Sequence, residues 1–168
     1  MGQAAPMLIR WHTLCLCVTL LLWLTAVQAL AQGGGGILSN AHTGVSGTYS
    51  AQMRISNHPH HVLMGHVIHV TRQAETVRAL VIGQRRDGVH RLWFNEAWSE
   101  GIELPYARTR GLGCTHGHCR DAPVGMIFLS QALFARAADH GLSARLVGPS
   151  GALDIAVPAA LFRAAAAM

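Results

Sequence analysis

Residues 142–157 read LSARLVGPSGALDIAV, and in this stretch apolar and polar side chains alternate on both sides of the turn formed by residues 148–151. An alternation with a period of two is typical of a β-strand that buries one face. Two such runs that flank a short turn containing glycine predict a β-hairpin. The stretch therefore predicts antiparallel β structure in the last part of the chain.

Two short helices are predicted, one before and one after this hairpin. Ser130 is a typical N-cap residue, and Gly141 stands where a glycine commonly ends a helix. Between them, apolar side chains share one helical face: Leu133, Phe134 and Ala137. After the hairpin, Pro158 suits the first position of a closing helix, with Leu161 and Phe162 packing back onto the domain.

Short β-like segments precede the helices. They cover residues 48–55, 61–71, 77–84 and 101–106. The Asp87–Gly88 dipeptide favours a two-residue hairpin turn, which would place Ile82 opposite Trp93. We therefore expect Trp93, Phe94 and Trp98 to be packing residues, as large aromatic side chains mostly are.

Many short strands at close spacing, together with two small helices, predict a mainly β fold. The expected architecture is a small antiparallel β-sandwich, immunoglobulin-like or barrel-like, with two short helices near the C-terminus. We expect one domain, because the length that remains after the N-terminal leader is typical of one domain. Its predicted range is residues 44–168.

The first residues have the pattern of a bacterial signal peptide. A short segment with a single full charge, Arg10, is followed by an apolar run over residues 14–27 and by small residues that permit cleavage after Ala29 or Ala31. The prediction is a signal peptide over residues 1–31 and a flexible glycine-rich tether over residues 32–43. The mature protein would be periplasmic or secreted. The alternative is that the leader is kept as a membrane anchor, because residues 14–31 approach the roughly 20 apolar residues needed to span a bilayer. Contact with a membrane is expected only through this leader.

The charge balance indicates which partners are plausible. All 13 basic residues are arginine, there are 8 acidic residues, and the formal net charge is +5. A modest positive charge favours acidic lipids or polysaccharides. The chain lacks basic runs with interleaved aromatic residues, so nucleic acid is not expected. The predicted partner is an unknown protein, a polysaccharide or another envelope component.

Two cysteines outside the leader, Cys114 and Cys119, enclose the sequence Thr-His-Gly-His. In an oxidising compartment paired cysteines are normally bridged, so a disulfide is predicted. The alternative is a metal site in which both thiolates and the imidazoles of His116 and His118 bind zinc or copper.

Histidines are frequent: the chain has 11 of them, and five lie between His58 and His69. His58, His60 and His61 surround Pro59 and are near enough in sequence to share one metal ion. If folding brings His116 or His118 to them, copper or zinc could bind there. The other interpretation is a polar turn, which becomes cationic below about pH 6.5.

No catalytic pattern is present. Neither residues 44–47 nor residues 148–151 continue into a Gly-x-Ser-x-Gly elbow, and no glycine-rich phosphate loop follows a strand. The sequence thus predicts no catalytic residues and no cofactor, with copper or zinc as the alternative. A binding or interaction module is favoured over an enzyme.

The order of elements in the second half resembles the invasion-associated locus B family of exported bacterial proteins. The similar features are the apolar strand around residues 92–94, the segment GIELPY at 101–106, the cysteines at 114 and 119, the helix at 130–141, the strands up to Val157 and the terminal segment 158–162. The resemblance implies an exported protein with a β-rich fold. It implies no catalytic residues, because the family has none established.

Overall fold

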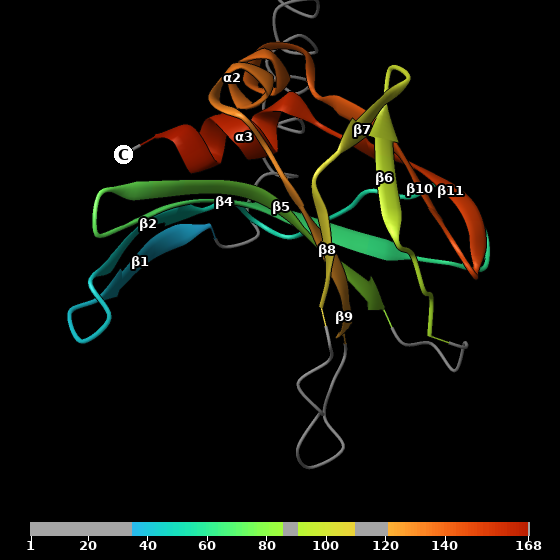
Figure 1. Cartoon of the computed structure of the whole chain (residues 1–168), viewed down its shortest axis with the longest axis horizontal. Coiled ribbons are helices and arrows are strands. Elements are labelled where there is room, and N and C mark those ends of the chain that lie inside the picture. Colours follow the sequence, from blue (N-terminus) through green and yellow to red (C-terminus); the bar gives the residue numbers. More distant parts are fainter. Residues whose placement is uncertain (1–34, 86–90, 110–120, 168) are drawn as a thin grey trace, which may run out of the picture. The chain divides into compact units, whose positions relative to one another are not determined.

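The hairpin expected over residues 142–157 is present in the computed structural model, which describes residues 35–85, 91–109 and 121–167 (Figure 1). Strand β10 (Leu142–Gly148) pairs antiparallel with β11 (Gly151–Val157) in the register that the turn implies. Every second side chain of both strands is buried, and Leu146 opposite Leu153 lies in the core. The alternation in the sequence therefore becomes one buried face, as predicted.

Two antiparallel sheets are formed by the described residues. The smaller sheet has the order β11-β10-β6-β7, with β6 at Glu96–Ser99 and β7 at Ile102–Leu104. The larger sheet has the order β1 (Gly36–Asn40), β2 (Val45–Tyr49), β4 (Leu63–Arg72), β5 (Glu75–Arg85), β9 (Asp121–Phe128) and β8 (Tyr106–Arg108), and β3 (Met53–Arg54) also pairs with β4. The fold is mainly β, as expected for a small β-sandwich.

Two helices near the C-terminus complete the fold, as the sequence predicts. Helix α2 (Gln131–His140) begins where the Ser130 side chain accepts a hydrogen bond from the backbone N–H of Leu133, at 3.2 Å. It ends at Gly141, whose φ of 81° favours glycine. Helix α3 (Ala159–Ala166) starts one residue later than predicted, so that Pro158 is its N-cap. No helix in the described part of the chain has the length and apolar character to cross a membrane.

The tether predicted over residues 32–43 is wrong for its second part. Residues 36–40 form β1, which pairs with β2 over five positions, from Gly36 opposite Tyr49 to Asn40 opposite Val45. The segment shows no hydrophobic alternation because most of its side chains are exposed, and it pairs with β2 through its backbone. The ordered domain therefore begins before Gly44, and the predicted strand 48–55 is divided into β2 and β3.

The prediction of a hairpin around the Asp87–Gly88 dipeptide is wrong about which segments pair. Strand β5 pairs with β4 along one edge and with β9 along the other, so neither edge is open to residues 91–95. Ile82 lies opposite Gly125 instead of Trp93. The dipeptide itself lies outside the described residues. A turn signal is local, whereas the partner of a central strand is decided by burial across the whole sheet.

Candidate functional site

The segment of residues 53–57 connects the two sheets. β3 pairs with β4 in the larger sheet, and two residues later Ser56 forms a bridge with Ile155 of β11 in the smaller sheet. The backbone N–H of Ala156 donates to the carbonyl of Ile55 at 2.8 Å and secures this crossing. As a result, Asn57 lies beside β11, the edge strand of the smaller sheet.

A row of side chains crosses the smaller sheet from this point. Asp154 of β11 lies opposite Arg145 of β10, which lies opposite Trp98 of β6. The antiparallel bridge between Ser56 and Ile155 sets Asn57 next to Asp154. Neighbouring strands lie about 4.8 Å apart. We call these four residues, Asn57, Asp154, Arg145 and Trp98, the cross-strand row.

The cross-strand row lines an open hollow of about 570 Å³. Ile55, Ala144 and Ile155 are buried residues that supply apolar atoms to the hollow. Glu100, in the turn between β6 and β7, is a further polar residue at its wall. The combination of an apolar lining with a few fixed polar groups is typical of small-molecule and oligomer binding sites.

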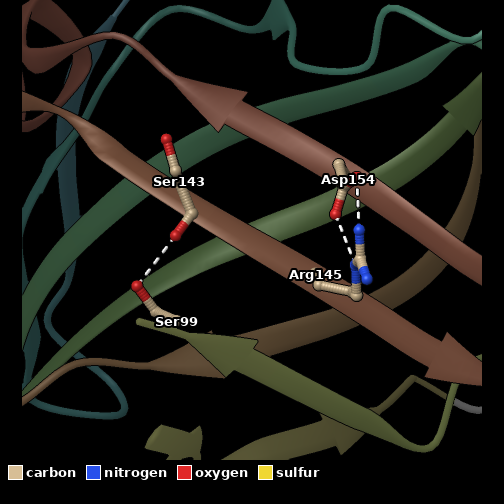
Figure 2. A network of polar contacts seen from close by, with 4 residues as sticks. All are labelled: Ser99, Ser143, Arg145 and Asp154. Carbon is tan, nitrogen blue, oxygen red and sulfur yellow. Dashed lines mark hydrogen bonds and ion pairs between the residues drawn. The ribbon is translucent and has the colours of Figure 1, made fainter. Parts of the chain in front are cut away.

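Two polar contacts hold the strands around the hollow (Figure 2). Arg145 donates to both carboxylate oxygens of Asp154, from Nε at 2.7 Å and from Nη2 at 2.9 Å. The Ser99 hydroxyl donates to the Ser143 carbonyl at 2.8 Å. The hydrogen bond from Arg145, together with its charge, lowers the pKa of Asp154, and the same hydrogen bond raises the pKa of Arg145. Because both side chains are well exposed, the pair fixes their orientation more than it adds stability.

Two further polar groups at the hollow also have partners. The indole Nε1 of Trp98 donates to Oε2 of Glu96 at 2.9 Å, which limits rotation of the ring. Glu100 forms an ion pair with Arg136 of α2 at 3.1 Å. Both carboxylates that line the hollow, those of Glu100 and Asp154, are thus paired with an arginine.

The structure brings three of the predicted metal ligands together. The rings of His58 and His61 stack with centroids 4.7 Å apart, and the ring of His60 lies 6.0 Å from that of His58. Burial, and secondly the charges of the other two histidines, lowers the pKa of His61. Its Nδ1 is buried and has no hydrogen-bond partner among the residues that the structure describes. Within the described ranges, no group of three or more His, Cys, Asp or Glu side chains has a geometry that could hold a metal ion.

The other predicted site residues, Cys114, Cys119, His116 and His118, lie outside the described residues, as do the predicted cleavage sites at Ala29 and Ala31. Their predicted disulfide, metal site and signal peptide therefore stay predictions.

Comparisons with protein-family models, curated proteins and solved structures give no match for this chain. The candidate site is therefore defined by its geometry. Sequence reasoning missed the cross-strand row, although half of it was accessible: in a hairpin that turns at residues 148–151, Arg145 and Asp154 must face each other. The position of Trp98 was not accessible, because it depends on the pairing of β6 with β10.

Proposed function

We propose that this protein is an exported, non-catalytic binding module of the bacterial cell envelope, and that it holds a segment of polysaccharide in the hollow. The observation that carries this proposal is the cross-strand row, which sets the Trp98 ring in line with three planar hydrogen-bonding groups along one hollow. A sugar ring offers an apolar face that stacks on an aromatic ring and hydroxyl groups that bond to such planar side chains. The signal-peptide pattern supports export to the periplasm or the medium.

The pairing of the carboxylates supports binding without hydrolysis. A glycoside hydrolase needs one carboxyl group that stays protonated as an acid, with a raised pKa. The pKa of Asp154 is lowered, and the carboxylate of Glu100 is paired with Arg136. The lowered pKa of Asp154 suits this carboxylate to accept hydrogen bonds from hydroxyls and not to act as the acid.

Replacement of Trp98 by alanine is expected to reduce affinity for polysaccharide about tenfold or more, because aromatic anchors carry much of the energy at such sites. Affinity electrophoresis through gels that contain hydroxyethyl cellulose or alginate measures this directly. Trp98→Phe is the matched control, since it keeps a ring and should retain most of the affinity. If neither polysaccharide retards the wild type, or if Trp98→Ala is retarded equally, the proposal is wrong.

A second candidate is a periplasmic copper or zinc protein, in which the gathered His58, His60 and His61 would be joined by His116 or His118 as a further ligand. Its test uses protein purified without a histidine tag or a nickel column. Free thiols together with stoichiometric copper or zinc, lost in His61→Gln, would support the metal protein. A mass lower by a pair of hydrogens than that of the reduced chain, with no bound metal, would support a Cys114–Cys119 disulfide and the binding module.

A further inference from the structure

A second surface feature lies on the chain segment that leads into β6. Residues 91–95 are extended without being part of a strand, and their side chains alternate between core and solvent. Leu92 and Phe94 are buried, at 7% and 1% exposure, whereas Trp93 between them is 42% exposed. Trp93 thus offers a large aromatic surface to solvent between two core residues.

Hydrogen bonds hold the backbone of this segment in place. The N–H of Leu92 donates to the buried Gln84 Oε1 at 2.8 Å. Trp93 exchanges two hydrogen bonds with Ser150 in the β10–β11 turn: its N–H donates to the Ser150 hydroxyl at 2.8 Å, and its carbonyl accepts from the Ser150 N–H at 3.2 Å. The backbone of Trp93 is consequently fixed, and its side chain remains exposed.

Two guanidinium groups lie over the Trp93 ring. The guanidinium carbon of Arg108, on β8, is 4.5 Å from the centroid of the Trp93 ring, and that of Arg91 is 5.5 Å away. Arg91 Nη2 also donates to the carbonyls of Thr109 and Pro123, each at 3.2 Å, which fixes its position. We call Arg91, Trp93 and Arg108 the cationic platform.

Within the cationic platform, Arg108 carries N–H hydrogen-bond donors that no described residue uses. It is exposed, and it makes no hydrogen bond or ion pair with any residue that the structure describes. A guanidinium stacked on an indole keeps its in-plane N–H groups open, and it gives up little hydration because it is weakly hydrated. Such a preoriented fork matches the two oxygens of a carboxylate or phosphate group.

The cationic platform and the hollow lie close together along the chain. Trp93 and Trp98 are five residues apart on the same segment, which an extended chain spans in at most roughly 18 Å. Their neighbours Phe94 and Ala97 are buried, whereas Trp93 is 42% exposed and Trp98 lines the hollow. A short oligosaccharide is long enough to contact both rings.

We infer that the polysaccharide bound in the hollow is acidic, and that its carboxylate or phosphate groups bind Arg108 on the cationic platform. This inference rests on the proposed function and names the ligand class of the same surface. Among the described residues that line the hollow, the one arginine is Arg145, and it is already paired with Asp154. The cationic platform supplies the charge that selects an anionic chain.

The test compares Arg108→Gln with Arg72→Gln, since Arg72 is also exposed, at the last residue of β4, and its loss changes the net charge equally. Binding to alginate, a polyuronate, and to neutral hydroxyethyl cellulose is measured by affinity electrophoresis. Arg108→Gln should weaken alginate binding about tenfold, as expected for losing a hydrogen-bonded ion contact. It should leave the neutral glucan unaffected, and it should reduce the salt sensitivity of alginate binding. Arg72→Gln should behave as the wild type does.

The outcomes separate this inference from the proposed function. If Trp98→Ala loses alginate and Arg108→Gln binds it normally, the acidic selectivity is wrong and the hollow remains the site. If no variant or wild type binds either polysaccharide, both proposals fail. If Arg108→Gln instead loses binding only to phosphatidylglycerol vesicles, with alginate binding unchanged, the cationic platform contacts lipid phosphate and the inference is overturned.

Discussion

Replacement of Phe162 by alanine is expected to lower the free energy of unfolding by about 3–5 kcal/mol. Phe162 lies on α3 and is completely buried, and its ring meets that of Phe134 edge to face with centroids 5.9 Å apart. Truncation would leave a cavity where α3 and α2 meet, which the surrounding side chains can fill only in part. Because small domains are stable by about 5–15 kcal/mol, the variant should unfold at a much lower urea concentration.

Two control variants make this expectation specific. Phe162→Leu keeps most of the volume and should lose less than about 1.5 kcal/mol. Ile37→Ala removes a side chain that is 81% exposed and should change stability by less than about 0.5 kcal/mol. Equal urea midpoints for Phe162→Ala and Ile37→Ala would contradict the packing of α3 described above.

Replacement of Gly148 by alanine is expected to cost about 1–3 kcal/mol of stability and to weaken binding to alginate. A Cβ at this position would lie 2.6 Å from both the Trp93 carbonyl oxygen and the Phe94 Cα. These are backbone atoms, so the contact can be relieved only by moving the extended segment or the β10–β11 turn. Either movement displaces the cationic platform relative to the hollow.

Urea unfolding and affinity electrophoresis on the same preparation measure the two effects of Gly148→Ala. Pro149→Ala is the control, because it changes the neighbouring exposed residue of the turn and should cost less than about 1 kcal/mol. Unchanged stability in Gly148→Ala would show that the turn and the extended segment are not in contact.

The elements that the sequence predicts correctly are those formed by residues near each other in the chain. The hairpin of β10 and β11 and the capped helix α2 depend on local alternation and on Ser130 and Gly141, so their signals lie within a short window. The order of the larger sheet depends on pairing between distant segments. The partners of β5 cannot be read from its own residues, which explains the error at the Asp87–Gly88 dipeptide.

The residues considered for a functional site likewise fall into those placed by the local sequence and those placed by contacts between distant segments. His58, His60 and His61 are close in sequence and come together in the structure. Trp93 and Trp98 were both expected to be packing residues, yet Trp93 is partly exposed and Trp98 lines the hollow. The environment of Trp93 is set by its hydrogen bond to Ser150 in the β10–β11 turn, and that of Trp98 by the pairing of β6 with β10. Neither contact can be recognised in the local sequence pattern.

Strand β1 has a practical consequence for recombinant production. A chain that starts at Gly44, the predicted start of the domain, would lack the strand that covers the outer edge of β2. The uncovered N–H and C=O groups of β2 would then be open to strands of other molecules, which is a common route to aggregation. Soluble expression therefore favours a start site before Gly36.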